Sequence, residues 1–191
     1  FVKIVASDGA EDDYFGYEVS ISGDRAIIGA EYDDGNAEQS GSAYIFSWDG
    51  NNWVEEQKLI AIDGSTYDYF GSSVAINENF AVVGAYRHDE WLGAVYIFRW
   101  NGKTWEQTQK LLSSDGAGMF GCSVSVSGDL ALVGATGADD YGLSSGAAYI
   151  FEWNGNFWEK KQKLLASDGA EGDEFGYSVS ISGDVAMVSA V

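Results

Sequence analysis

The residues of this chain that could do chemistry are mostly carboxylates, accompanied by a single histidine and a single cysteine. Of the 191 residues, 30 are Asp or Glu and only 10 are Lys or Arg, so the formal net charge is −20. Such a charge repels nucleic acid and anionic lipid, and it attracts cations or basic partners. No apolar run approaches the roughly 20 residues that a membrane helix requires. The sequence therefore predicts neither a nucleic-acid partner nor membrane insertion.

Catalytic motifs are missing around the one histidine. His88 stands next to Asp89, and no serine or cysteine lies in a nucleophile motif such as a hydrolytic triad requires. We expect His88 to be a solvated loop residue and Cys122 to be a small buried residue of the core. Carboxylates scattered over loops do not define the two fixed positions that glycoside hydrolysis needs. The sequence predicts that the protein is not an enzyme.

The elements that must position these residues repeat along the chain. Phe-Gly is followed 14 residues later by Gly-Ala three times and by Ser-Ala once, and the Phe residues are Phe15, Phe70, Phe120 and Phe175. Each of the first three copies continues with Tyr-Ile-Phe, two Trp residues five apart and Gln-Lys-Leu. A period of roughly 50 to 55 residues is typical of one propeller blade rather than of a helical repeat.

Four short strands are predicted in each period, because apolar residues alternate at period two between Gly-containing turns. In the first period these strands, called A to D, cover residues 15–21, 26–30, 43–48 and 53–60. The predicted fold is an all-β propeller of four-stranded antiparallel blades. Its expected parts are residues 1–5 as the last strand of a preceding blade, 6–60, 61–112 and 113–165 as three blades, and 166–191 as the first two strands of a fourth.

The order Phe-Gly, strand, Gly-Ala, Gly-x-x-Tyr resembles the FG-GAP repeat, the blade unit of the integrin α N-terminal propeller and of many secreted or surface proteins. The resemblance covers essentially the whole chain. It implies a ring of seven blades with about 28 strands, whereas 15 strands are predicted here from the sequence. We therefore expect a longer native polypeptide or a multi-chain assembly. The alternative is a closed four-bladed ring that lacks one strand C.

This chain departs from the family pattern in two ways. The last residue of the motif is proline in the family, and its place is taken here by Glu31, Tyr86, Thr136 and Val191. The A–B turns also lack the Asp-rich calcium loop of the integrin version, and one carboxylate in a tight turn cannot supply the six to eight oxygens that calcium prefers. The family's calcium sites are therefore not carried over.

Loop lengths indicate which face of the blades binds a ligand. The A–B and C–D turns have constant length, whereas the B–C and D–A connections vary and hold 19 of the 30 acidic residues. Variable loops on a rigid scaffold commonly bind partners. Trp91, the one Trp outside the repeat, lies in the shortest B–C loop. The candidate ligand-binding residues are Trp91, His88, Asp89, Asp33, Asp34, Glu38, Asp139 and Asp140.

Calcium is the only cofactor that the sequence suggests, bound weakly by acidic loops. The candidate ligands are Glu11, Asp12, Asp13, Asp33, Asp34, Asn36 and Glu38. They do not follow the twelve-residue spacing of a calcium-binding loop. The alternative interpretation is that these acids bind no ion and only keep the protein soluble.

The sequence as a whole predicts a secreted, extracellular or cell-surface binding or adhesion propeller whose acidic loop face engages a protein or a glycan. One alternative is a structural protein that packs with copies of itself into a surface layer or filament. A second is a carbohydrate-binding propeller that uses the Trp pairs. We expect those pairs to pack as cross-strand neighbours instead: Trp48 with Trp53, Trp100 with Trp105, and Trp153 with Trp158.

Overall fold

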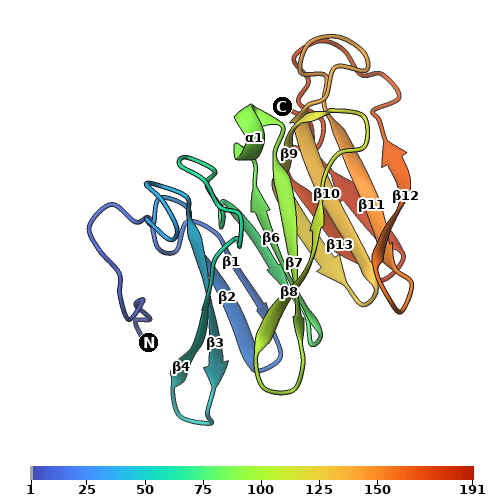
Figure 1. Ribbon diagram of the computed structural model, residues 1–191. Helices are drawn as coiled ribbons and strands as arrows, with labels where there is room; N and C mark the ends of the chain where they lie inside the picture. The colour runs from blue at the N-terminus through green and yellow to red at the C-terminus, as the bar shows by residue number, and fades with distance from the viewer. Residues whose placement is uncertain (1) are drawn as a thin grey trace.

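The computed structural model describes residues 2–191, and these form antiparallel β-sheets that stand side by side (Figure 1). Three sheets have four strands each and one has two, which confirms the predicted all-β, blade-like architecture. The first sheet contains β1 (Val19–Ser22), β2 (Arg25–Ala30), β3 (Ser42–Trp48) and β4 (Trp53–Leu59). The second contains β5 (Ser73–Ile76), β6 (Phe80–Ala85), β7 (Ala94–Trp100) and β8 (Trp105–Leu111), with α1 (His88–Trp91) between β6 and β7. The third contains β9 (Gly118–Ser127), β10 (Leu130–Gly137), β11 (Ala147–Trp153) and β12 (Trp158–Leu164), and the fourth β13 (Val179–Ser182) and β14 (Val185–Val188).

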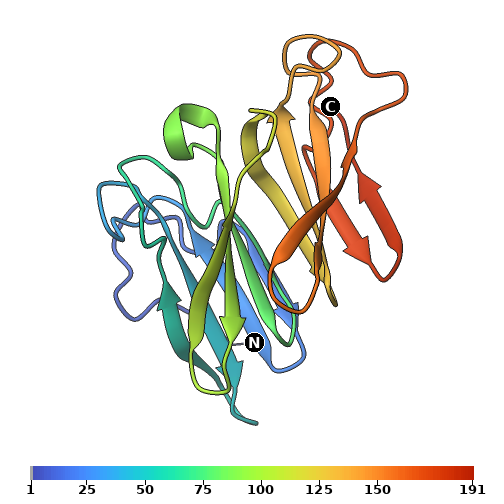
Figure 2. The same cartoon turned by 45° about the vertical axis from the view of Figure 1, so that its right-hand side comes forward.

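The first strand of each sheet lies on the inner side of an arc. β1 contacts β5, β5 contacts β9 and β9 contacts β13, while the later strands of each sheet fan outward (Figure 2). The tight A–B and C–D hairpins lie at one end of the sheets, and the longer connections at the other (Figure 1). We call the latter the loop end, and it comprises residues 2–18, 31–41, 60–72, 86–93, 112–117, 138–146 and 165–178.

Hydrophobic cores fill the spaces between the sheets. Ile27 and Ile45 of the first sheet pack with Val74, Ile76 and Tyr96 of the second, and all five side chains are buried. The next two junctions repeat this arrangement. Both faces of an internal sheet are therefore covered, which explains why its second strand, β6 or β10, reads as a nearly continuous apolar run.

The glycines of Phe-Gly and Gly-Ala let neighbouring sheets approach one another closely. A Cβ atom at Gly29 would collide with the backbone carbonyl of Gly71 in the next sheet, and Gly84 meets Gly121 in the same way. Gly134 and Gly176 form the third such contact. The two glycines also meet within one repeat, because the Gly16 N–H donates to the Gly29 carbonyl at 2.9 Å and the Gly71 N–H donates to the Gly84 carbonyl at 2.9 Å.

The Gln-Lys-Leu segment contributes a second link between sheets. The amide of Gln57 donates to the backbone carbonyl of Trp105 at 2.8 Å and accepts from the Trp105 backbone N–H at 2.8 Å. Gln109 bonds Trp158 in the same bidentate way, at 2.9 and 2.7 Å. These bonds join the outer strands, far from the glycine contacts of the inner strands.

The Trp pairs pack across their hairpins, as predicted. Trp48 lies directly opposite Trp53 in the β3–β4 register, with ring centroids 5.7 Å apart. The pairs in the second and third sheets are 5.5 and 6.1 Å apart. Trp105 and Trp158 are each only 2% exposed, so these two rings belong to the core and not to an open platform.

Two predicted strands differ from the structure. β1 starts at Val19 and not at Phe15, because the preceding residues leave the extended conformation: Tyr14 has a φ of 55° and Gly16 a φ of 94°. The expected strand at residues 1–5 is also wrong for its described part, since residues 2–5 form no strand. They have no neighbouring strand to pair with, and Ile4 packs instead on the outer face of the first sheet. Within residues 2–191 the chain thus has 14 strands, one fewer than predicted.

The outer face of the first sheet is open along β1, and the outer face of the fourth sheet is open as well. Val19 and Ile21 are 61% and 66% exposed, whereas the equivalent Val74 and Ile76 of the second sheet are each 4% exposed under the first sheet. Met187 in β14 is 72% exposed. No helix within residues 2–191 is both long and apolar enough to cross a bilayer.

Candidate functional site

The second sheet carries a surface cavity at the loop end, of about 400 Å³, between two neighbouring connections. One wall is the D–A connection at residues 65–68 and the other is the B–C connection at residues 87–91. Three of the predicted ligand-binding residues, His88, Asp89 and Trp91, line it. The structure therefore brings the predicted Trp, His and Asp of this loop together around one hollow.

A strained turn presents Trp91 to solvent. α1 is not a right-handed helix, because Asp89, Glu90 and Trp91 all have positive φ angles, of 52°, 56° and 75°. Non-glycine residues rarely adopt this conformation, and three in succession cost several kcal/mol at roughly 1–3 kcal/mol each. The indole of Trp91 is 46% exposed. Backbone strain of this kind is commonly retained where it serves function.

The Arg87 side chain packs against Trp91 and holds it in position. Its guanidinium lies 3.9 Å from the centre of the Trp91 ring system and 4.7 Å from that of Tyr69. It also donates a hydrogen bond of 2.7 Å to the Tyr69 hydroxyl. A guanidinium stacked between two aromatic rings holds both in place by cation–π attraction. Trp91 is thus exposed and positioned at the same time.

An aromatic row runs from Trp91 across the junction with the first sheet. Its members, in order, are Tyr14, Tyr32, Tyr69, Tyr86 and Trp91, and successive ring centroids are 4.5, 4.9, 5.9 and 5.9 Å apart. Tyr14 and Trp91 at its two ends are 51% and 46% exposed. Stacked and edge-on rings at these distances attract one another. The row joins the loop ends of two sheets into one surface.

His88 is not a solvated loop residue, contrary to the prediction. Its side chain is only 12% exposed, and its Nδ1 lies 2.7 Å from Oδ2 of Asp68. Its Nε2 lies 2.6 Å from Nζ of Lys110, which in turn bonds Asp63 at 2.7 Å. An ammonium group can only donate, so Nε2 accepts and Nδ1–H donates to Asp68. Both ring nitrogens are occupied, which leaves no free nitrogen to act as a base.

The other two complete sheets hold an equivalent cluster with carboxylates alone. Lys58 lies 2.7 Å from Asp8 and 3.0 Å from Asp33, and Lys163 binds Asp115 and Asp140 at 2.7 and 2.5 Å. The Tyr44 hydroxyl lies 2.9 Å from Asp8 and 2.8 Å from Asp33, and its single hydrogen is shared between these two carboxylates. The hydrogen bond from Lys58 is the main reason why the pKa of Asp8 is lowered. In the second sheet His88 takes the place of one carboxylate.

Most of the other predicted site residues are used within their own loops. Asp33 is buried at 4% exposure and also accepts from Ser42 at 2.7 Å, and Asp140 is bound to Lys163. Three more carboxylates accept hydrogen bonds from backbone N–H groups: Asp34 from Gln39 at 2.9 Å, Asp139 from Ser144 at 2.7 Å and Asp13 from Ala10 at 2.6 Å. Glu38 accepts from the Tyr67 hydroxyl at 2.9 Å. The Asn36 side-chain amide donates to the Ala61 carbonyl at 2.5 Å. Glu11 and Asp12 stay exposed.

No metal site emerges from these acids in the part of the chain that the structure describes. No group of three or more His, Cys, Asp or Glu side chains there has a geometry that could hold a metal ion. Glu11, Asp12 and Asp13 precede the first sheet, while Asp33 to Glu38 lie in its B–C connection. Weak calcium binding by these loops stays a prediction.

Sequence reasoning missed several residues of this region. Arg87, Lys110 and the tyrosines of the aromatic row received no role, although Lys58, Lys110 and Lys163 recur in the Gln-Lys-Leu segment. That recurrence was a signal for the ion-pair clusters. Cys122, predicted as buried core, is only partly buried and lines a cavity on the inner side of the arc.

Comparison with known proteins identifies the repeat. The sequence pattern of the FG-GAP repeat matches residues 1–46, 53–98, 105–151 and 158–191. Among solved structures, the crystal structure of Saccharomyces cerevisiae Sqt1 matches with a TM-score of 0.51 and 10% sequence identity, over 84% of this chain and 38% of that chain. At this identity the likeness shows a propeller-like fold alone. No similar sequence was found among curated proteins.

Proposed function

Because the chain belongs to the FG-GAP repeat family, we propose that it is a non-enzymatic binding and adhesion module that engages an extracellular or cell-surface partner through its loop end. A propeller of FG-GAP repeats fits a protein-binding repeat domain, and the family is generally non-enzymatic. The occupied nitrogens of His88 agree with this proposal.

The observation that carries the proposal is the strained turn under Trp91. Three successive left-handed residues hold a large aromatic ring 46% exposed at the rim of a cavity of about 400 Å³. Folding alone gains little from that arrangement, because the ring buries only part of its surface while the backbone is strained. A partner that covers Trp91 recovers the missing burial, and Trp is among the residues that most often dominate binding energy.

Charge favours a basic partner surface. Asp89 and Glu90 immediately precede Trp91 and form no salt bridge among the described residues, and the chain carries a net charge of −20. A cationic partner is steered toward such a surface at low ionic strength, and this effect weakens as salt screens it. The association rate of the partner is therefore expected to fall when the salt concentration rises.

The test compares two equally exposed aromatic residues at opposite ends of the sheets. Trp91 and Phe157 are each 46% exposed, and Phe157 lies in the C–D turn of the third sheet, away from the loop end. The immobilised chain is presented to purified extracellular-matrix proteins and to a glycan array. Trp91→Ala is expected to weaken any binding at least tenfold, whereas Phe157→Ala leaves it unchanged. Equal effects of the two variants would refute the loop end as the binding surface.

Two alternatives remain from the sequence. A layer- or filament-forming role is favoured by the open faces of the first and fourth sheets, and it requires polymers in light scattering. A carbohydrate ligand is favoured by the aromatic row, since sugars stack on exposed aromatic rings, but the Trp hairpins do not support it because Trp105 and Trp158 are buried. The glycan array separates this last case from a protein partner.

A further inference from the structure

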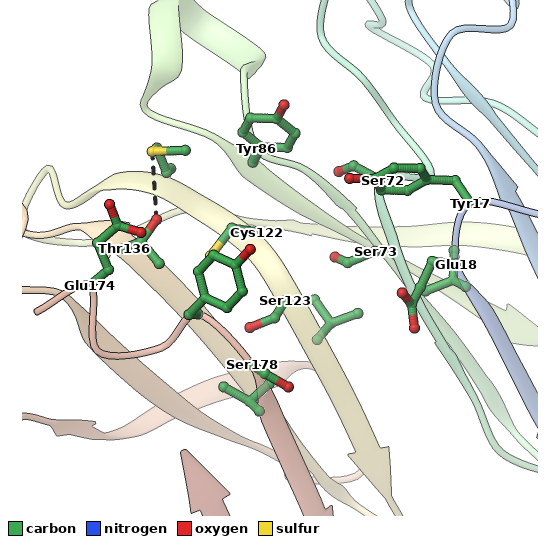
Figure 3. A pocket seen from close by; sticks show the side chains of 15 residues that line it. Tyr17, Glu18, Ser72, Ser73, Tyr86, Cys122, Ser123, Thr136, Glu174 and Ser178 are labelled. Carbon is green, nitrogen blue, oxygen red and sulfur yellow. Dashed lines mark hydrogen bonds between the residues drawn. The ribbon is translucent and has the colours of Figure 1, made fainter. Parts of the chain in front are cut away.

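A second cavity, of about 420 Å³, lies on the inner side of the arc, where the first strands of the sheets come together (Figure 3). Its walls carry two carboxylates, Glu18 and Glu174, and three phenols, Tyr17, Tyr86 and Tyr177. Figure 3 shows Glu18 and Tyr17 on one side, Glu174 on the opposite side, and Tyr86 above the opening between them. The other lining residues are neutral, and none is Lys, Arg or His.

The acidic groups of this cavity have no cationic partner in residues 2–191. The ion pairs of that part of the chain all involve other carboxylates, and neither Glu18 nor Glu174 is among them. Burial raises the pKa of Glu18, which is the expected response of a carboxyl group without a compensating charge. The cavity therefore presents uncompensated negative charge between aromatic walls.

Glu31 adds an independent observation beside the cavity. It is 3% exposed, and its Oε2 atom has no hydrogen-bond partner. Its charge is the main cause of the raised pKa of Tyr17, and after burial it is the next cause of the raised pKa of Tyr86, about 12. Both phenols line the cavity, and Glu31 holds in the first sheet the repeat position that the lining residues Tyr86 and Thr136 hold in the second and third.

Other buried carboxylates of this protein show what Glu31 lacks. Asp33 and Asp68 are each 4% exposed, and they are compensated by Lys58 and His88, respectively. A buried carboxylate without a donor costs several kcal/mol, and natural proteins rarely leave one unpaired. The exception at Glu31 points to a donor that comes from outside the described chain.

We propose that this inner cavity binds an organic cation, an ammonium or guanidinium group that belongs to a small amine or to a basic side chain of another protein. Phenol faces attract such groups by cation–π contacts, and the carboxylates supply charge-assisted acceptors. The cavity is within the usual size range of organic ligand sites, and no three-ligand metal geometry occurs among residues 2–191. This site is separate from the cavity at Trp91 and does not rest on the proposed function.

The experiment uses two cationic probes and their neutral counterparts. Calorimetric and NMR titrations are carried out with butylammonium against butanol, and with an acetylated, amidated Gly-Gly-Lys-Gly-Gly peptide against its norleucine analogue. The variants are Glu31→Gln and Glu174→Gln, and the matched control is Glu11→Gln, which removes an exposed carboxylate that does not line the cavity. Glu31→Gln removes a buried charge, so it is expected to fold.

Saturable binding of a cationic probe, with no binding of its neutral counterpart, is expected. Each of the two cavity variants should weaken it about tenfold or more, the loss expected for one charge-assisted hydrogen bond, and Glu11→Gln should not. A peptide that binds at least tenfold tighter than butylammonium identifies a protein side chain as the source, and equal affinities identify a free amine. Absence of binding, or equal weakening by Glu11→Gln, would overturn the proposal.

Discussion

Replacing Glu31 by glutamine is expected to remove a large part of the pH dependence of folding stability between pH 5 and pH 8. Burial raises the pKa of Glu31 from an ordinary value of 4.5 to about 7. The folded protein therefore holds the proton more tightly than the unfolded chain does. Below pH 4.5 Glu31 is neutral in both the folded and the unfolded state, so its burial does not lower the folding stability. As the pH rises through 7 the buried group ionises, and the stability that the neutral form provided is lost.

The size of the effect follows from the same two pKa values. One unit corresponds to about 1.4 kcal/mol, so a rise from 4.5 to about 7 amounts to about 3 kcal/mol of destabilisation once the group is fully ionised. Glutamine has nearly the same shape and no charge to bury. The Glu31→Gln protein should be the more stable one by about 3 kcal/mol at pH 8 and by about 1 kcal/mol at pH 5.

Urea denaturation of the two proteins at half-unit pH intervals measures this difference directly. Glu18 is the same in both proteins. The pKa values of Tyr17, Tyr32 and Tyr86 are raised above their ordinary value of 10.0, so these phenols stay neutral between pH 5 and pH 8 with or without the Glu31 charge. A fixed offset from the buried amide does not matter, because the prediction concerns the change with pH. Glu11→Gln, at an exposed position, serves as the control and should run parallel to the parent. If Glu31→Gln also runs parallel to the parent, the carboxylate is not buried as a charge and the reasoning fails.

Three further predictions concern the junctions between sheets and the acidic loops. Gly84→Ala should lower stability by about 3 kcal/mol in urea denaturation, because its Cβ meets the Gly121 carbonyl, whereas Gly9→Ala, whose Cβ has only ordinary contacts, should cost less than 1 kcal/mol. Gln109→Ala should lower the free energy of unfolding by about 2 kcal/mol, since it removes two hydrogen bonds to Trp158. The matched control is Gln162→Ala in β12, because Gln162 is exposed and has no cross-sheet bond among the described residues. Equal losses of stability in the two variants would show that the Gln109 bonds contribute nothing. Millimolar calcium should raise the melting temperature by a few degrees through relief of carboxylate repulsion, and a variant with Asp12 and Asp13 changed to Asn should lose that response; an unchanged response would place the effect elsewhere.

The sequence predicted the sheets well because their signals are local and repeated. Alternating apolar residues, Gly-containing turns and the paired Trp residues each depend on neighbours within one hairpin, and the structure has them in the expected register. The predicted start of strand A was wrong because Tyr14 adopts a left-handed conformation, which its residue type does not predict. The expected strand at residues 1–5 failed because a strand needs a partner, which the sequence motif alone does not supply.

The candidate site was predicted less completely, since it depends on contacts between segments far apart in the sequence. The loop of Trp91 was recognised because it interrupts the repeat, but Arg87 and the aromatic row form only when the first two sheets pack together. Asp33 and Asp140 were predicted to bind a ligand, whereas lysines from β4 and β12 bind them. A carboxylate in a loop can thus serve the fold or a ligand, and only its neighbours in space decide which.

Ser189 distinguishes the fourth sheet from the other three. It occupies the place of Gly29, Gly84 and Gly134, and at each of these glycines a Cβ would collide with the carbonyl of the Phe-Gly glycine in the following sheet. Ser189 has such a Cβ. Val185 and Met187 on the same hairpin are 67% and 72% exposed, so this face is apolar but lacks the small residue that lets two sheets meet closely. Any sheet that packs there must stand further from β14 than the sheets do at the three described junctions, and it cannot make the close glycine contact that these junctions share.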